Sequence, residues 1–211
     1  MPSRVQHKRT RKTPAARRAE IVDAAAAVAL AEGLECVTLR RIGEELGVRP
    51  GLISHYFPSA DDLVAEAFGS ASSAERAQGT PTLHLGWFFA RATGTSYDNI
   101  SRLWINARHL SRYRPVLRDR VAEQEAAWRE RLTGLIRQGV DRGEFRTDNP
   151  YVTAIQILVV LDGLGAHANT DTGNRPAAVS RMAATTAERE LGLPHGTLTR
   201  SGPPLTASPT G

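Results

Sequence analysis

Apolar residues recur along most of the 211-residue chain at the three- and four-residue spacing of amphipathic helices. No segment shows the two-residue alternation of a half-buried strand. The first helix is predicted to begin at Pro14 with Thr13 as its N-cap, because this pairing satisfies a free backbone N–H and presets the helical backbone. Gly33 is predicted to end that helix. The pattern therefore predicts an all-α fold.

Two short helices are predicted next, one that Thr38 caps and Gly47 ends, and one from Pro50 to about Tyr56. Helices of this length are not stable on their own in water. Joined by the turn at Gly47 and supported by the first helix, they form a helix-turn-helix, whose second helix can enter the major groove of DNA. The alternative interpretation is an ordinary helical corner without a binding partner.

The remaining chain predicts a larger helical region. After a helix that Ser59 caps, apolar stripes predict helices from about Pro81, over 98–110, from Pro115 to Gly143, over 149–169 and over 176–191. The predicted domains are a basic arm (1–13), a helix-turn-helix domain (14–59) and a second domain (60–193). Residues 194–211 are rich in Pro, Gly, Ser and Thr, which predicts a disordered tail.

The predicted helix over residues 149–169 is apolar nearly all round and must therefore be covered on every side. The chain looks too small to surround it. We therefore expect one face to meet a second copy of the chain, in an intersubunit four-helix bundle with the last helix. Leu158 and Leu161 are the predicted dimer contacts. The alternative is a central helix fully buried within a monomer.

Basic residues are concentrated at the N-terminus. The first eighteen residues hold seven Lys or Arg and no acid, in a chain of net charge +5, and no carboxylate occurs between Glu45 and Asp61. Taken alone, such an arm is either a solvated tail or a segment that gains from counterion release on a nucleic acid. Beside an acid-free second helix, it favours DNA binding.

Candidate ligand contacts in the second domain are Trp87, Trp104 and Trp128, each of which is otherwise ordinary core. Asp162 stands in an apolar helix, where a carboxylate is costly unless it is paired. We expect an ion pair with an arginine, within the chain or across the dimer, and the alternative is an anchor for a cationic ligand. The weaker polar candidates, most of which are expected to be exposed or structural, are Asn106, His109, Gln156 and His167.

Catalytic chemistry is not indicated. The six histidines lack metal-ligand spacing, and the chain has neither a phosphate loop nor a nucleophile motif. No catalytic residue, metal or cofactor is predicted, and an enzyme is the less favoured alternative. The single cysteine, Cys36, fits a reducing compartment. The most apolar stretch, 154–168, is interrupted by Gln156 and Asp162 and judged too short to span a bilayer, which predicts a cytoplasmic protein without a membrane partner.

The segment "VTLRRIGEELGVRPGLISHYFPSADDL", residues 37–63, resembles the TetR family of bacterial transcriptional regulators. The resemblance covers about residues 19–68. It implies a homodimer in which each subunit has a three-helix DNA-binding domain and a larger helical domain that dimerises and holds a small ligand. The expected function is a repressor released from a palindromic operator by a small-molecule effector. The alternative is an architectural DNA-binding protein without an effector, which should lack a buried cavity in the second domain.

Carried over residue by residue, the resemblance implies that Thr38 approaches a phosphate and that Arg40 contacts a base or the backbone. On the second helix it implies base-reading positions at Pro50, Gly51, Leu52 and Ser54, and backbone-contacting positions at His55 and Tyr56. Three residues depart from the family pattern: Arg49 where Ser or Thr often caps the helix, Ser54 where Tyr is usual, and Ala60 where Lys often meets phosphate. Arg49 adds a cation, and the basic arm could compensate for the other two.

Overall fold

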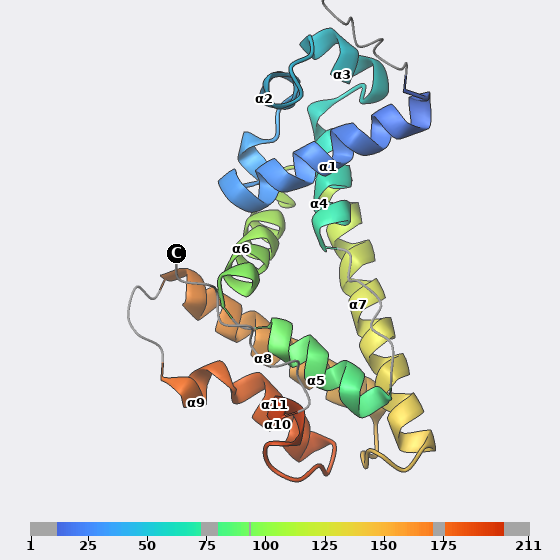
Figure 1. Cartoon of the computed structure of the whole chain (residues 1–211), viewed down its shortest axis with the longest axis vertical. Coiled ribbons are helices and arrows are strands. Elements are labelled where there is room, and N and C mark those ends of the chain that lie inside the picture. Colours follow the sequence, from blue (N-terminus) through green and yellow to red (C-terminus); the bar gives the residue numbers. More distant parts are fainter. Residues whose placement is uncertain (1–11, 73–79, 93, 171–175, 201–211) are drawn as a thin grey trace, which may run out of the picture.

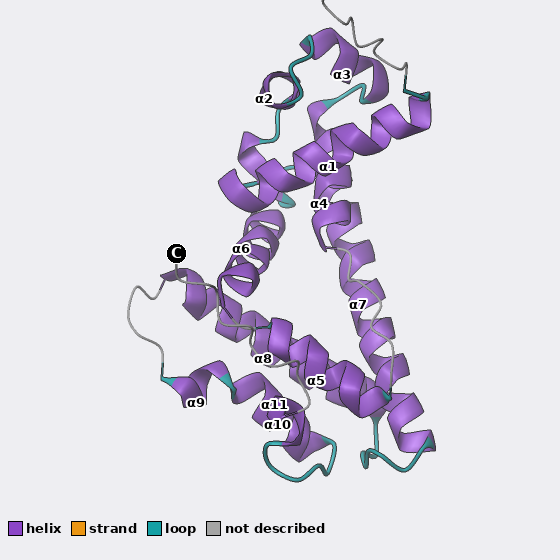
Figure 2. Ribbon diagram, viewed as in Figure 1, coloured by secondary structure: helices purple, strands orange, loops and turns teal. Residues whose placement is uncertain are grey.

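The structure, a computed structural model, describes residues 12–72, 80–92, 94–170 and 176–200 (Figure 1). Throughout these ranges every regular element is a helix, which confirms the all-α prediction (Figure 2). The elements are α1 (Pro14–Glu32), the 3₁₀ helix η1 (Leu34–Cys36), α2 (Leu39–Glu45), α3 (Pro50–Tyr56), α4 (Ala60–Ser72), α5 (Pro81–Arg91), α6 (Gly94–Leu110), α7 (Pro115–Asp141), α8 (Pro150–Thr170), α9 (Ala177–Ser180), α10 (Met182–Glu190) and α11 (Thr197–Arg200).

The helices form two packed regions that α6 and α7 connect (Figure 1). The first core is built from buried side chains of α1, η1 and α2–α4, such as Leu34, Ile53 and Phe68. Leu103 of α6 and Leu117 of α7 are buried in the same core. The ends of these two long helices therefore belong to the packing of the N-terminal region.

The second core lies among α5, the C-terminal half of α7, α8, α10 and α11. At the end of α7, Phe145 folds back so closely that a Cβ at Gly139 would lie 2.1 Å from its ring. Glu144 then reaches α5, where its carboxylate accepts hydrogen bonds from the hydroxyl and the backbone N–H of Thr82, at 2.6 and 3.1 Å. The hydroxyl bond lowers the pKa of Glu144. This turn thereby joins α5, α7 and α8.

The predicted N-caps of α1, α2 and α4 are confirmed, whereas the helix predicted over 98–110 begins earlier, at Gly94. Thr13 accepts a hydrogen bond from the backbone N–H of residue 16, and Thr38 accepts one from that of Arg41 at 3.0 Å. Ser59 accepts the N–H of Asp62 and donates its hydroxyl proton to the Asp62 carboxylate, at 3.1 and 2.7 Å. Each cap satisfies a backbone donor that the helix itself cannot.

The C-terminal segment differs from its prediction. The single helix expected over 176–191 is divided at Arg181 into α9 and α10. Disorder from residue 194 is wrong for residues 194–200, which fold back with Leu198 buried against the second core. The reason is Glu188, which is only 2% exposed and whose carboxylate accepts the backbone N–H groups of Gly196 and Leu198, at 2.9 and 2.8 Å. The rest of the predicted tail, 201–211, lies outside the described residues.

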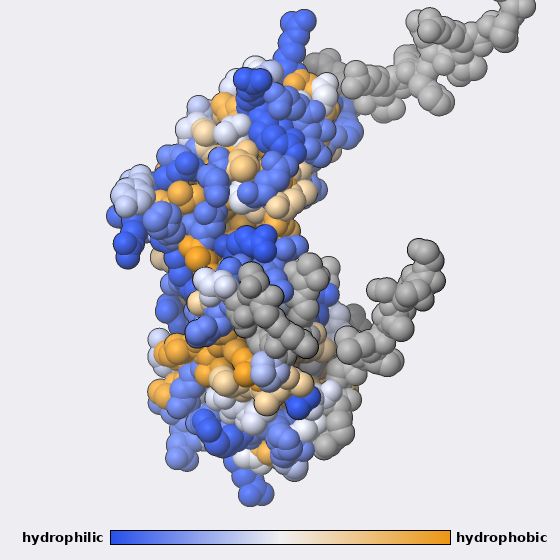
Figure 3. Space-filling model, turned by 90° about the vertical axis from the view of Figure 1, so that its left-hand side faces the viewer, coloured by the Kyte–Doolittle hydropathy of each residue, from blue (hydrophilic) through white to orange (hydrophobic). Residues whose placement is uncertain are grey.

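Helix α8 is longer than the apolar stretch in the sequence indicates. Within the described residues it is the one helix long and apolar enough to cross a membrane, over Pro150–His167, with a third of that window buried. The judgement that this segment is too short is therefore wrong. Here α8 packs against α6, α7 and α10, and Figure 3 shows apolar side chains gathered on the surface of the half of the molecule that carries α8–α10.

Candidate nucleic-acid interface and effector region

A tight turn sets the angle between α2 and α3. The N–H of Val48 donates to the carbonyl of Gly43 at 2.8 Å, and Gly47 follows the helix with a φ of 62°, which is a Schellman ending. A Cβ on Gly43 would lie 3.0 Å from the Val48 carbonyl oxygen and 3.4 Å from the nitrogen of Pro50. The sequence pattern pointed only to Gly47, although Gly43 is what allows the two helices to approach.

Most of the predicted DNA contacts lie on the outward face of α3, whereas Thr38 caps α2 and Arg40 lies in it. Ile53 and Phe57 are buried and hold α3 on the first core. All nine candidates are exposed or half-buried, namely Thr38, Arg40, Arg49, Pro50, Gly51, Leu52, Ser54, His55 and Tyr56. Arg49 makes no side-chain hydrogen bond to the start of α3, as its departure from a capping residue predicts. The face offers hydroxyl, imidazole and small apolar groups and carries no acid.

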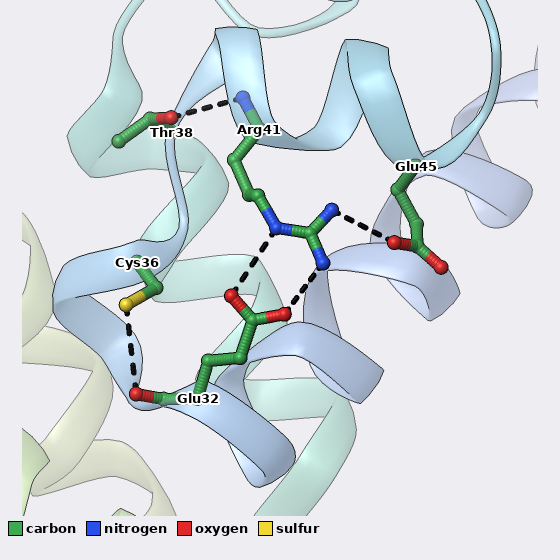
Figure 4. A network of polar contacts seen from close by, with 5 residues as sticks. All are labelled: Glu32, Cys36, Thr38, Arg41 and Glu45. Atoms are coloured by element: carbon green, nitrogen blue, oxygen red, sulfur yellow. Dashed lines mark hydrogen bonds and ion pairs between the residues drawn. The ribbon is translucent and has the colours of Figure 1, made fainter.

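Arg41 holds the helix-turn-helix to α1 (Figure 4). Its guanidinium donates to the carboxylate of Glu32 at the end of α1, with one contact at 3.2 Å, and to that of Glu45 in α2 at 2.7 Å. The hydrogen bond from Arg41 lowers the pKa of Glu32. The sequence pattern did not point to Arg41, because its role depends on Glu32, which lies in a different helix.

Arg40, the predicted base or backbone reader, lies on the exposed side of α2. Its side chain is 84% exposed, and its Nε donates to the Glu44 carboxylate at 2.9 Å. An exposed pair four residues apart on a helix contributes little, because solvent screens the two charges. A phosphate or a base can therefore displace Glu44 at small cost. Of the basic arm, residues 1–11 lie outside the described residues, and Lys12 pairs with Glu20 at 2.7 Å.

Two family models match this chain, one over the helix-turn-helix region and one over the larger helical region. Residues 21–67 match bacterial regulatory proteins of the tetR family, and residues 89–192 match the C-terminal domain of BetI-type transcriptional repressors. The chain belongs to the TetR family. The fold of a helix-turn-helix domain followed by a larger helical domain is the one that the resemblance implied.

Solved structures share this TetR-family fold. A protein of Rhodococcus sp., described as a TetR-family transcriptional regulator, is 24% identical with a TM-score of 0.66, over 80% of this chain and 95% of that one. A TetR-family regulator of Cytophaga hutchinsonii is 19% identical with a TM-score of 0.69, over 86% and 98%. A transcriptional regulator of Saccharomonospora viridis in complex with choline is 23% identical with a TM-score of 0.62, over 82% and 94%. No curated protein gives a significant match.

The three tryptophans that were predicted to line a cavity have separate neighbours. Trp128 donates its indole N–H to the carbonyl of Ser72, at the end of α4, at 3.2 Å. Trp104 meets the edge of Phe68 at a centroid distance of 5.0 Å, and Trp87 lies under an arginine of its own helix. All three are half-buried. The contacts of Trp104 and Trp128 connect helices, and a shared role of the three tryptophans around a ligand stays a prediction.

Two open pockets lie elsewhere on the described residues. One, of about 430 Å³, lies beside the turn between α7 and α8, and the other, of about 520 Å³, lies between α3, α4 and α7. Neither is lined by the three tryptophans or by Asp162. The buried cavity expected of an effector site is thus also still a prediction.

Asp162 forms the ion pair with an arginine that the sequence predicts, and it does so within the chain. The Arg108 guanidinium donates to Asp162 of α8 and to Glu125 of α7, both at 2.9 Å. The same guanidinium lies over the ring of Trp104, 5.2 Å from its centre. Arg108 therefore joins α6, α7 and α8 in one network that is still open to solvent.

The predicted dimer contacts need a correction. Leu161 is only 8% exposed and packs in the second core of its own chain, and Leu158 is half-buried against that core. The outward stripe of α8 is offset by one residue from the predicted contact Leu158. Its exposed residues are Val152, Gln156, Val159, Gly163 and Ala166. Their alternating spacing of four and three residues is that of a helix-packing seam.

The close approach at Gly43 yields a paired test. Gly43→Ala should destabilise the protein by about 1–3 kcal/mol, because the added Cβ meets a backbone carbonyl that cannot move without opening the turn. Gly51→Ala is the control, since a Cβ there meets nothing within 4 Å and should stabilise α3 by about 0.5–1 kcal/mol. Urea unfolding measures both free energies, and equal values for the two variants would contradict the tight turn.

Proposed function

We propose that the protein is a sequence-specific DNA-binding transcriptional regulator, a homodimeric repressor that a small-molecule effector releases from a palindromic operator. The observation that carries the proposal is the acid-free, exposed face of α3, held on a rigid helix-turn-helix in a chain of the TetR family. Small groups such as Gly51 and Ser54 let this helix come close to base edges. Leu52 can pack on a thymine methyl group.

Helix α8 supports the homodimer. Val159 is 62% exposed and Val152 45% exposed, although both lie on the most apolar helix of the chain. Gly163 lies in the same stripe, and a Cβ added to it would meet nothing within 4 Å, so a second helix could approach closely. Met182 of α10, also exposed, would extend this surface. A two-fold axis through this stripe would make the surface self-complementary.

The charge network around Arg108 supports a cationic effector. Its guanidinium already occupies the place of a cation, between the Asp162 carboxylate and the face of Trp104. A ligand cation of similar size could take these partners and displace Arg108. The similar protein from S. viridis was solved with choline, a small cation. We therefore favour an effector with an apolar body and one positive centre over an architectural protein without an effector.

Selection from a random pool of duplexes tests the proposed DNA binding. The purified protein should enrich a palindrome, because two copies of α3 related by a two-fold axis read the same half-site twice. The measurement is sequencing of the bound fraction after several rounds. A pool that remains random would contradict sequence-specific binding, and enrichment of a single unrepeated site would contradict the dimer.

Charging the outward stripe of α8 tests the dimer. Val159→Arg should give monomers and weaken operator binding by about 100-fold, because each subunit then binds its half-site independently. Val116→Arg is the matched control, a valine of comparable exposure on α7, and should leave the dimer intact. Sedimentation at micromolar concentration measures both. A monomeric wild-type protein, or a dimeric Val159→Arg variant, would contradict α8 as the dimer helix.

Arg40 separates base reading from backbone contact. Arg40→Ala should weaken binding to the selected duplex by roughly 1–3 kcal/mol if the guanidinium contacts a base, and should cost much less on random DNA. Glu44→Ala is the companion variant, which frees Arg40 and should bind at least as tightly as the wild type. Titrations on both duplexes measure these effects. Equal losses on both DNAs for Arg40→Ala would show that it contacts only the backbone.

A further inference from the structure

Asn106 of α6 links the half of the molecule that carries α8 to the start of the helix-turn-helix. We propose that Asn106 is a positioning residue for DNA binding, which holds the connection between α1 and α2 in a fixed place relative to α8. The inference rests on the proposed function, because it concerns how two copies of α3 are set apart on one operator.

The contact is a single long-range hydrogen bond. Oδ1 of Asn106 accepts the backbone N–H of Leu34 at 2.9 Å. Leu34 is the first residue of η1, where a backbone N–H has no acceptor within its own helix. Its side chain is fully buried, and Gly33 before it has a φ of 107°. Asn106 therefore supplies the acceptor that holds a sharp turn in place.

The position of η1 determines where α2 begins. The N–H of Val37 donates back to the carbonyl of Leu34 at 3.2 Å, and the Val37 side chain is buried. Thr38 follows at once as the N-cap of α2, and Arg41 ties the next turn to the end of α1 (Figure 4). A displacement of Leu34 would therefore move α2, and the close contact at Gly43 would pass it on to α3.

Helix α6 is in turn bonded to α8. The hydroxyl of Tyr97 donates to the carbonyl of Leu161 at 2.6 Å, near the start of α6. Asn169 donates its amide N–H to the hydroxyl of Ser101 at 3.0 Å, and a Cβ on Gly165 would lie 2.8 Å from the Ser101 Cβ. Toward the other end of α6, Arg108 holds Asp162. Asn106 thus belongs to a helix that is bonded to α8 near both of its ends.

Through these bonds Asn106 affects where α3 lies, and not only how stable the turn at Leu34 is. Two copies of α3 can read a palindrome only when they lie about one DNA turn, roughly 34 Å, apart. The bond to Leu34 helps to keep each α2–α3 pair at half that distance from the proposed two-fold axis. Its loss should weaken the preference for one half-site spacing and leave the general attraction to phosphates unchanged.

The test compares Asn106→Leu, which removes the acceptor at similar size, with Asn106→Asp, which keeps it. The probes are the palindrome that the wild type selects, the same palindrome with one or two base pairs inserted at its centre, and a random duplex. Asn106→Leu should bind the palindrome about tenfold more weakly, bind the random duplex as the wild type does, and discriminate less between the original and the inserted spacing. Asn106→Asp should restore both properties.

Circular dichroism and melting identify a variant that fails to fold, in which case Asn106→Ser replaces Asn106→Leu. Hydrogen exchange provides a second readout without DNA: the amides of η1 and α2 should exchange faster in the Leu or Ser variant, and those of α8 should not. Wild-type spacing preference and wild-type exchange in that variant would overturn the proposal, as would an Asp variant that fails in the same way. If the wild type selects no duplex, the proposed function fails, and exchange alone decides whether Asn106 positions α2.

Discussion

The first core is closed by two long helices that follow the helix-turn-helix region in the chain, and the rest of the structure depends on this shared packing. Leu103 and Ala107 of α6, with Leu117 and Val121 of α7, are buried among the side chains of α1–α4. Each leucine or valine buried in this way contributes roughly 1.5–3 kcal/mol. Because a unit as small as α1–α3 buries little surface by itself, it takes much of its stability from the long helices.

The two long helices reach the first core separately, and each has its own hydrogen bonds or ion pairs to another helix. One is α6, which the Tyr97 hydroxyl fastens to α8. The other is α7, whose Arg120 pairs with Glu66 of α4 at 2.9 Å and whose Gln124 contacts Ser72 at the end of α4. Below the first core, α6 and α7 diverge (Figure 1). A change in their separation would act on the first core, which is close-packed and cannot deform smoothly.

The features predictable from the sequence are those whose cause lies within a few residues. Thr38 could be identified as a cap because the N–H that it accepts is three residues away. Gly43 could not, because a glycine inside a helix reads only as a loss of helix propensity until the neighbouring helix is in place. Val159 and Leu161 are two positions apart on an almost wholly apolar helix. On such a helix the pattern of apolar residues does not indicate which side faces outward. Glu188 looks like a surface acid until residues 196 and 198 fold over it.

The two adjacent arginines of α2 show how one short helix can combine stability with discrimination. Arg41 is held by two carboxylates and fixes α2 on α1, whereas Arg40 has one exposed partner, Glu44. In the proposed DNA complex Glu44 would face the phosphates, and moving it aside would cost about the same on every sequence. Random DNA, which offers only phosphate contacts, would gain nothing further in return. A base contact by Arg40 would add a gain on the cognate site alone. Arg40 would therefore raise specific affinity relative to non-specific affinity, whereas the cost of moving Glu44 would lower both by about the same factor.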